Sequence, residues 1–480
     1  MPSGLIKKIG IFFMLGLLTA SAFFIRLENF KNSQMRSIDE IVYYRMAKQV
    51  LNEGLSGYNT IPYGKELAAH GRPLPDYFFQ PLFKHPPLFT CFLVFSMGIF
   101  GANIQSAVYV PLLAAALMIP LVYLLGALVF DRRAGILAAL FLWMDPVSVI
   151  CSQKVWMEST LAFWMVLSIY FFAYALYRNK DHFLIFSGVS CALAVLTKYT
   201  GILCLMIALY YAWMYRRDLF RNRKFLIGFC LPFVFLLPWV FWNYQVYGRD
   251  FFFIQKSLHH DAARVIIGLS GSRLVFMVIL VFVIVIGWNI YRHYRPQGPL
   301  PPVSVKESFP KRLFMTLLTL FTLTLLIWVV FPQIKNSLDM NFLPKTSWRT
   351  GAFAQESPLF YFQQLMAFSF IYFFAFLSIL GLPREDTEKK RILTASAILI
   401  LSFFILWRNY QSRYILPCLP FLIVLASQFL FKVYDMINKI AYFIPYILSK
   451  AVFVLGVIFI IAKTTYVNHI ISYPNDLCFF

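Results

Sequence analysis

The chain is 480 residues long, 60% hydrophobic and only 13% charged, with a mean hydropathy of +0.69. Soluble domains carry about 25% charged and about 45–50% apolar residues, and this much exposed apolar surface would make a soluble chain aggregate. The composition therefore excludes an ordinary soluble enzyme. It predicts an all-α protein that crosses the inner or plasma membrane of the cell many times.

The formal net charge of +22 is explained by the membrane and needs no nucleic-acid partner. In membrane proteins, Lys and Arg collect in the cytoplasmic loops, and here the basic residues cluster between apolar runs. The seven cysteines form no CxxC pair and lie mostly inside apolar runs. Neither a disulfide framework nor a zinc site is predicted.

The first apolar run, Ile9–Ile25, follows two lysines and contains Ala20-Ser21-Ala22, as a cleavable signal peptide does. The run is long for a signal peptide and many spans follow, so we predict a retained span with the N-terminus in the cytoplasm. The first outer loop then covers about residues 26–105. It includes Leu88–Gly101, which is too short to span comfortably and is expected to lie in the outer interface or to re-enter.

Placing each basic cluster in the cytoplasm predicts about 13 spans, with the C-terminus outside. The Pro-rich residues 296–311 are a predicted cytoplasmic linker. It joins a catalytic membrane module, residues 1–295, to C-terminal helices with outer loops and no soluble domain, residues 312–480. The predicted spans are Ile9–Ile25, Ser106–Phe130, Ala134–Ile150, Met157–Tyr177, Phe183–Leu196, Gly201–Tyr215, Phe225–Tyr244, Arg273–Tyr291, Leu313–Phe331, Phe362–Leu382, Ile392–Trp407, Tyr414–Tyr434 and Leu448–Val467.

The segment from Ile38 to Val50 predicts a short amphipathic helix on the membrane surface, because apolar residues recur at every fourth position. Asp39 and Glu40 are neighbours, so they point in different directions and only one of them can be central to a site. Tyr43 lies on the same stripe as Asp39. Both acidic residues are equally explained as favourable charges at a helix N-terminus.

Two further outer segments carry charged residues beside helix starts. Lys84-His85-Pro86-Pro87 precedes an apolar run, where Pro is typical of a helix start and Lys of a side chain that reaches the interface. Glu158 follows Trp156 at the outer end of a predicted span, a common position for both residue types. Each segment is a site candidate that also has a plain structural explanation.

Three basic residues on the predicted outer side oppose the positive-inside trend: Lys198 in a tight turn, and Arg408 and Arg413 in a short loop. Such residues are expected to have an anionic partner, and Arg binds phosphate with two parallel hydrogen bonds. Arg264 lies in the outer loop Gly248–Leu269, where an ordinary solvated charge is the simpler interpretation.

Taken in order, these segments resemble the GT-C superfamily of integral membrane glycosyltransferases. The pattern is nearest to the branch of the protein O-mannosyltransferases and the bacterial lipid A aminoarabinose transferase. Two departures are visible: Glu158 stands where that branch usually has Asp, and His85 is inserted into its usual Lys-Pro-Pro. The matching residues are Asp39, Glu40 and Tyr43, Lys84 to Leu88, Trp156-Met157-Glu158, Leu196-Thr197-Lys198 and Arg413-Tyr414-Ile415-Leu416-Pro417.

The resemblance implies an inverting glycosyltransferase that uses a polyprenyl-phosphate-linked sugar on the outer face. The acceptor is a hydroxyl or phosphate of a glycolipid, a glycan or a protein. Asp39 is then the base or the carboxylate that orients the acceptor, and Glu158 is the second catalytic carboxylate, which orients the acceptor or holds a metal. The remaining predicted substrate-binding residues are Lys84, Lys198, Arg408 and Arg413 for the departing phosphate, with Glu40, Tyr43, His85, Arg264 and Tyr414.

A divalent metal ion at Asp39 and Glu158 is left open, and no other cofactor is predicted. A lipid-linked-sugar transporter or flippase would need a similar number of spans. It would also need charges within the spans and is often built from an inverted repeat, and neither is evident. A non-catalytic scaffold subunit would not need the outer motifs at all. The sequence names neither the sugar nor the acceptor, although the absence of an outer soluble domain favours a small or membrane-anchored acceptor.

Overall fold

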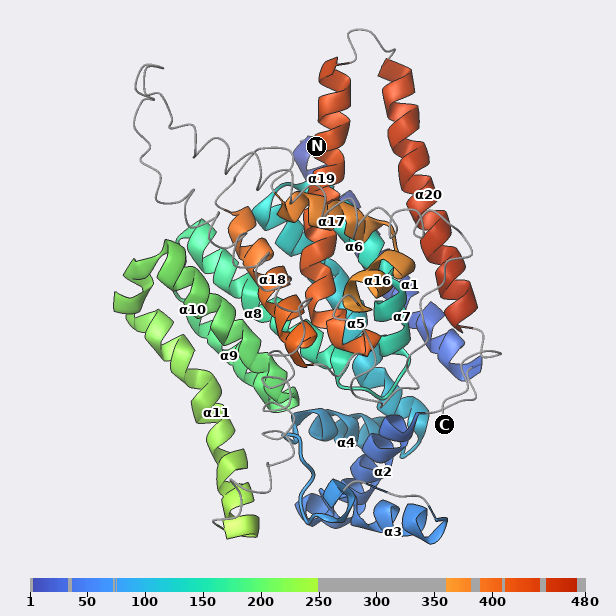
Figure 1. Ribbon diagram of the computed structural model, residues 1–480, viewed down its shortest axis with the longest axis vertical. Helices are drawn as coiled ribbons and strands as arrows, with labels where there is room; N and C mark the ends of the chain where they lie inside the picture. The colour runs from blue at the N-terminus through green and yellow to red at the C-terminus, as the bar shows by residue number, and fades with distance from the viewer. Residues whose placement is uncertain are drawn as a thin grey trace, which may run out of the picture.

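The computed structural model describes residues 3–32, 37–71, 74, 76–248, 360–380, 389–407, 411–440 and 446–472. In these ranges the chain is helical and contains no strand, which confirms the all-α prediction. Figure 1 shows a bundle of long helices with a small module, α2–α4, at one end. The α-helices are α1 Ser3–Asn32, α2 Ile38–Glu53, α3 Ile61–Ala69, α4 Leu88–Phe100, α5 Ile104–Val129, α6 Arg132–Met144, α7 Pro146–Ser152, α8 Glu158–Arg178, α9 Phe183–Thr197, α10 Leu203–Tyr215, α11 Arg223–Tyr247, α16 Phe360–Phe368, α17 Ile371–Ile379, α18 Lys390–Trp407, α19 Leu419–Ile440 and α20 Tyr446–Ser472.

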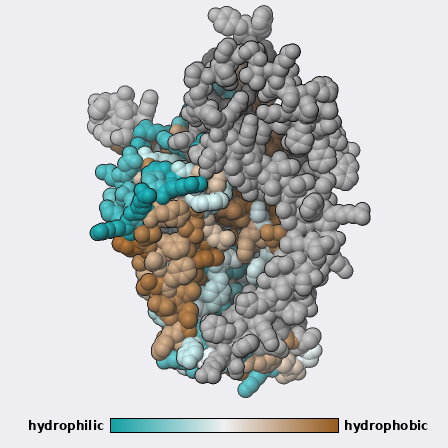
Figure 2. Space-filling model, turned by 60° about the vertical axis from the view of Figure 1, so that its left-hand side comes forward, coloured by the Kyte–Doolittle hydropathy of each residue, from teal (hydrophilic) through white to brown (hydrophobic). Residues whose placement is uncertain are grey.

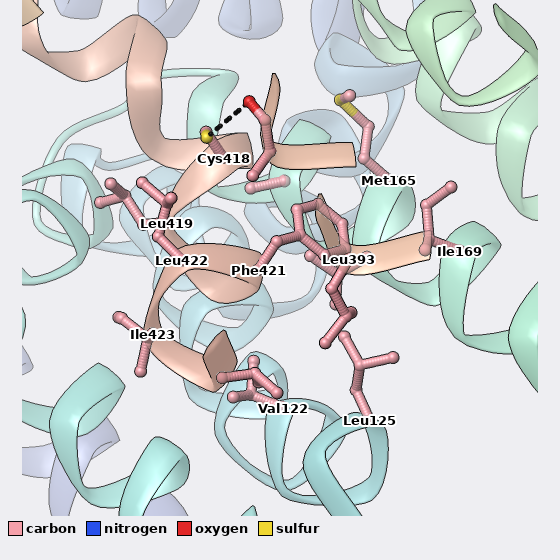
Figure 3. Close-up of a cluster of buried hydrophobic side chains, with 14 of the residues drawn as sticks. Val122, Leu125, Met165, Ile169, Leu393, Cys418, Leu419, Phe421, Leu422 and Ile423 are labelled. Carbon is pink, nitrogen blue, oxygen red and sulfur yellow. Dashed lines mark hydrogen bonds between the residues drawn. The ribbon is translucent and has the colours of Figure 1, made fainter. Parts of the chain in front are cut away.

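A continuous core of buried apolar side chains holds the bundle together. Figure 3 shows Phe421 and Leu422 of α19 among Val122 of α5, Met165 of α8 and Leu393 of α18, each at most 1% exposed. Lipid tails are as apolar as these side chains, so close packing stabilises the contacts more than exclusion from water does. The late helices are therefore integral to the same bundle as the early ones.

Six of the described helices are long and apolar enough to cross a membrane, or seven if the bent pair α6–α7 is one span. The long apolar helix α11 leaves Leu237 and Phe241 about 60% exposed. Figure 2 shows a broad hydrophobic surface beneath a hydrophilic cap, as expected of a face turned to lipid. These observations support a multi-pass membrane protein. Two predicted spans, Arg273–Tyr291 and Leu313–Phe331, and the Pro-rich linker lie outside the described residues.

The predicted span Ala134–Ile150 is wrong as a single helix, because the chain bends by 55° between α6 and α7. Asp145 lies at the break, where its side chain accepts from the Ser148 backbone N–H and caps α7. On the other side of the break, Arg26 of α1 donates to the carbonyl of Trp143 at 2.8 Å. A buried helix break needs such partners because lipid offers none.

Two other helices complete this break. The hydroxyl of Tyr372, in α17, donates to Asp145, and Asn468 of α20 donates to the Met144 carbonyl. Helix α1 continues beyond the predicted end of the first span, Ile25, through the buried Arg26 to Asn32. The predicted span Phe362–Leu382 is also divided, into α16 and α17 around Ser369.

The module α2–α4 has a core of its own, separate from that of the bundle. The apolar face of α2 was predicted to lie on the membrane, but it packs against α4 inside this core. Val42 and Met46 are buried there, and Ile38 is 42% exposed. α4 is a short helix whose N-cap residue is Pro87, in agreement with the predicted helix start. The module thus fixes two of the predicted site segments, at the N-termini of α2 and of α4.

The basic ends of several helices meet at the end of the bundle opposite to this module. Arg133 at the start of α6 lies 3.9 Å from Asp435 of α19, and Arg391 of α18 lies over the ring of Tyr215 of α10. Figure 1 shows α2–α4 at the other end. This sorting of charge supports the predicted sidedness, and the cytoplasmic location of the N-terminus stays a prediction.

Candidate functional site

The site is built around the N-terminus of α2, which is fixed by a capping box. Ser37 accepts from the backbone N–H of Glu40, and the Glu40 carboxylate accepts from the backbone N–H of Ser37 at 2.9 Å. The fully buried Glu40 also pairs with Lys154 at 3.3 Å and accepts from the Val155 N–H. The indole of Trp156 donates to Ser37 at 2.9 Å. Glu40 therefore attaches α2 to the segment that precedes α8.

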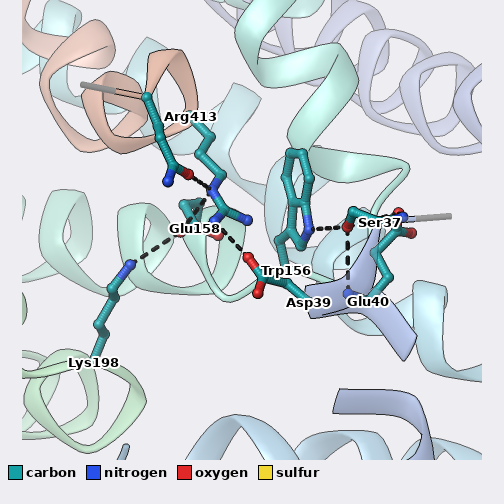
Figure 4. A network of polar contacts seen from close by, with 8 residues as sticks. Ser37, Asp39, Glu40, Trp156, Glu158, Lys198 and Arg413 are labelled. Carbon is teal, nitrogen blue, oxygen red and sulfur yellow. Dashed lines mark hydrogen bonds and ion pairs between the residues drawn. The ribbon is translucent and has the colours of Figure 1, made fainter. Parts of the chain in front are cut away.

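This attachment turns the neighbouring Asp39 toward a different part of the chain. Arg413 donates from Nη2 to Asp39 Oδ2 at 2.5 Å and from Nε to Gln411 Oε1 at 2.7 Å. Figure 4 shows Asp39 and Glu40 on opposite sides of Trp156, as the helical period predicted. Arg413 is 10% exposed and the Asp39 side chain 44%, so the carboxylate is the accessible partner of the pair.

Glu158, at the first position of α8, joins this pair to Lys198. Its Oε1 accepts from Lys198 Nζ at 3.0 Å and lies 3.9 Å from Arg413 Nε. The Glu158 side chain is 4% exposed and that of Lys198 15%. Lys198 thus has the anionic partner that its position in the outer turn predicted, and Figure 4 shows the chain of contacts from Lys198 to Asp39.

Two aromatic rings cover the cations of this cluster. The guanidinium of Arg413 lies 4.6 Å from the centre of the Trp156 ring, and Lys198 Nζ lies 4.4 Å from that of Tyr414. A cation over an aromatic face is stabilised by about 0.5–2 kcal/mol, most strongly where water is excluded. Tyr414 therefore lies in the cluster, in contact with a cation.

The segment Lys84-His85 approaches the same cluster from the start of α4. Although the Asp39 side chain is 44% exposed, the protein atoms crowded around it would by themselves raise its pKa. Arg413, Lys84 and Lys198 outweigh this effect and hold the pKa below the ordinary value of 3.8. Burial, followed by the charges of Lys84, Lys198 and Arg413, holds the pKa of His85 well below 6.5. The site thus presents an ionised carboxylate and a neutral imidazole among cations.

Tyr43 belongs to the core of the module, next to the site. Its ring packs edge-on against Phe83 and Phe89 and is 8% exposed. Burial and the nearby carboxylates of Asp39 and Glu158 raise the pKa of its hydroxyl well above 10. Tyr43 is therefore neutral, and its ring is part of the module core.

The structure brings together most of the predicted site residues but not all of them. Glu40 is turned away, with its carboxylate held by the capping box and Lys154. Arg264 and Arg408 lie outside the described residues. Sequence reasoning did not single out Gln411, which orients Arg413. The residues that the cluster unites are Asp39, Lys84, His85, Glu158, Lys198, Arg413 and Tyr414, with Tyr43 beneath them.

The two carboxylates are poorly arranged for a divalent metal ion. Within the described ranges, no three His, Cys, Asp or Glu side chains form a group that could hold one. Asp39 and Glu158 both contact Arg413, and Glu158 also holds Lys198. A divalent cation prefers several oxygen ligands, and here one oxygen of each carboxylate, Asp39 Oδ2 and Glu158 Oε1, already faces a cationic side chain. The described residues therefore do not fit a metal in this arrangement.

The family described as dolichyl-phosphate-mannose-protein mannosyltransferase matches residues 84–242, roughly a third of the chain. This range contains four of the residues in the cluster: Lys84, His85, Glu158 and Lys198. A comparison with curated protein sequences finds none that matches. The family match thus falls on the part of the chain that carries most of the predicted motifs.

Solved structures of membrane glycosyltransferases share the fold. ArnT from Cupriavidus metallidurans in the apo state matches with a TM-score of 0.54 and 15% identity, over 97% of this chain and 75% of that one. The archaeal oligosaccharyltransferase AglB from Archaeoglobus fulgidus, in complex with an inhibitory peptide and a dolichol-phosphate, matches with a TM-score of 0.53 and 17% identity. That match covers 95% of this chain and 56% of AglB, so the chain spans little more than half the length of AglB.

The chain therefore has the GT-C fold of integral membrane glycosyltransferases. Its resemblance to the protein mannosyltransferases is confirmed over residues 84–242 by the family match, and ArnT shares the fold.

Proposed function

We propose that the protein is an inverting glycosyltransferase that moves a sugar from a polyprenyl-phosphate-linked donor to a hydroxyl or phosphate acceptor on the outer face of the membrane. The observation that carries this proposal is the charge of the cluster. Three cations, Lys84, Lys198 and Arg413, surround two carboxylates, Asp39 and Glu158. The excess of positive charge favours an anionic ligand beside an accessible carboxylate.

The donor phosphate is assigned to the cationic side of the cluster. Arg413 and Lys198 are 10% and 15% exposed, and attraction between charges is stronger in such surroundings than in water. The fork of Arg413 is suited to bind two phosphate oxygens. ArnT has been solved with undecaprenyl phosphate and AglB with a dolichol-phosphate, which supports a lipid phosphate as a ligand of this fold.

The acceptor is assigned to Asp39. Among the described residues, Arg413 bonds Asp39 at Oδ2, which leaves Oδ1 for a hydrogen bond from an acceptor hydroxyl. The Asp39 side chain is 44% exposed, so an acceptor can reach it. Its lowered pKa keeps the carboxylate ionised, so it can accept a hydrogen bond from the acceptor hydroxyl and orient it. A weak base suffices to take the proton, because the hydroxyl becomes acidic as its oxygen bonds to the anomeric carbon.

In the proposed transfer, the donor, the acceptor and Asp39 together account for each bond, proton and electron pair. The acceptor oxygen attacks the anomeric carbon from the side opposite to the phosphate, and its proton passes to Asp39. The bond from the anomeric carbon to the phosphate oxygen breaks, and the departing phosphate keeps the electron pair. A phosphate is a competent leaving group, so no general acid is needed, unlike in the glycosidases with two carboxylates. Lys84, Lys198 and Arg413 stabilise the phosphate.

Glu158 takes part by positioning both cations, because its Oε1 contacts Lys198 at 3.0 Å and lies 3.9 Å from Arg413. Removing a buried partner leaves the other charge uncompensated, at a cost of about 3–5 kcal/mol. Glu158→Gln should therefore lower donor affinity and protein stability together. No step of the proposal passes through a metal ion.

The test uses purified protein with a radiolabelled undecaprenyl-phosphate sugar in detergent or liposomes. A transferase releases free undecaprenyl phosphate in step with glycosylated product, whereas a transporter moves the donor without cleaving it. Asp39→Asn should reduce transfer by roughly 100- to 10,000-fold. Glu66→Gln is the matched control, because Glu66 belongs to the same module and pairs with Arg45 at the exposed surface. Equal activity of both variants would overturn the assignment of Asp39.

A further inference from the structure

His85 has an unusual position at the edge of the cluster. Its Nδ1 atom is buried, and within the described part of the chain it has no hydrogen-bond partner. Buried polar atoms are nearly always paired, because an unpaired one loses its bonds to water without replacement. The imidazole packs edge-on against Phe83 at 5.5 Å. A ring held in this way with an unpaired nitrogen indicates a ligand atom as the missing partner.

The backbone beneath His85 is held rigidly. Tyr58 is fully buried, and its hydroxyl donates to the carbonyl of His85 at 2.8 Å and to that of Pro86 at 3.2 Å. The backbone N–H of Phe83 donates to the carbonyl of Tyr58. Trp239 of α11 packs edge-on against Tyr58 at 5.9 Å. The backbone that carries the imidazole is therefore fixed, so this backbone need not reorganise when a ligand binds.

The charge state of His85 decides which part of the donor it can bind. Burial disfavours a protonated ring, and Lys84, Lys198 and Arg413 are all near enough to disfavour it further. A neutral imidazole adds no charge to bind a phosphate oxygen, and the three cations beside it already serve that purpose. It offers one donor and one acceptor nitrogen, the combination that suits a sugar hydroxyl.

We propose that His85 hydrogen-bonds a hydroxyl of the donor sugar next to the phosphate and so helps to determine which sugar is transferred. This inference rests on the proposed function. It assigns the residue inserted between Lys84 and Pro86 to sugar selection, while Lys84, Lys198 and Arg413 bind the phosphate. A site built to bond a hydroxyl discriminates against analogues that lack it, because its own polar atom is then left unpaired.

The experiment compares two probes, undecaprenyl phosphate and a panel of undecaprenyl-phosphate sugars that differ at single hydroxyls. The variants are His85→Phe, which keeps the ring packing, and His85→Asn, whose amide can replace Nδ1. His70→Asn is the control, since His70 is exposed on the same module. His85→Phe should bind undecaprenyl phosphate with unchanged affinity, lose about tenfold in kcat/KM with the best sugar donor and discriminate less among the sugars. His85→Asn should recover part of both losses.

Equal weakening of undecaprenyl phosphate and of the sugar donors by His85→Phe would overturn the inference, because the histidine would then serve the phosphate. Unchanged kcat/KM and unchanged discrimination would also overturn it. Failure of the proposed function has a different signature: the unaltered protein would cleave none of the sugar donors. In that case the inference fails with it.

Discussion

Replacing Arg413 by Lys separates the geometry of this side chain from its charge. Arg413 donates one hydrogen bond to Asp39 at 2.5 Å and another to Gln411 at 2.7 Å, with Glu158 3.9 Å away. A lysine keeps the positive charge, but its single ammonium cannot reproduce the planar fork. A charge-assisted hydrogen bond contributes about 1.5–3 kcal/mol. Losing one of them in the donor complex should reduce kcat/KM by roughly 10- to 150-fold.

Steady-state transfer from an undecaprenyl-phosphate sugar by Arg413→Lys and Arg413→Ala is the assay. The alanine variant should be worse, because it also leaves Asp39 and Glu158 without their shared cation. Arg45→Lys is the matched control: Arg45 pairs with Glu66 where both side chains are about half exposed, and such surface pairs contribute about 0–1 kcal/mol. Wild-type donor kinetics in both Arg413 variants would refute the placement of the phosphate.

Three other predictions concern stability, pH and sidedness. Glu40→Gln should lower the melting temperature, since breaking a buried ion pair costs about 3–5 kcal/mol, and transfer per folded molecule should be retained. Lost transfer at unchanged stability would contradict the structural role of Glu40. Above the ordinary carboxyl pKa of 3.8, Asp39 is ionised and paired with Arg413, and this pair is lost only as the pH falls through the lowered pKa. The value of kcat/KM should therefore be constant from about pH 8 to pH 6. A fall in kcat/KM toward acidic pH within that range would refute this prediction. In intact cells, Lys65→Cys should react with a membrane-impermeant thiol reagent and Arg217→Cys should not; the reverse pattern would invert the predicted topology.

The helical period and the charge rule predicted much of the site. A period of 3.6 residues separates adjacent side chains, so Asp39 and Glu40 had to diverge, and the structure directs them to Arg413 and Lys154. The structural role of Glu40 could also be predicted, because a Ser three residues before a Glu, as Ser37 is before Glu40, is the pattern of a capping box. Its assignment to substrate binding disregarded that pattern.

Other features could not be predicted from local patterns. Asp39 and Arg413 are 374 positions apart, and no periodicity brings such distant residues into contact. The helix break at Asp145 was hidden by the apolar residues around it, although a residue that precedes a Pro disfavours helix and was a warning. Arg26 looked like the start of a polar loop because its partners belong to the break in another span.

The helix break between α6 and α7 has a consequence for biosynthesis. When α6 and α7 first enter the bilayer, Arg26 can already donate to the carbonyls of residues 142 and 143. The donors to the Met144 carbonyl and to the Asp145 carboxylate, Asn468 and Tyr372, are made more than 200 residues later. Polar backbone facing lipid is costly. A chain that ends before residue 468 therefore lacks the Asn468 donor to the Met144 carbonyl, at a buried helix break more than 300 residues from that end.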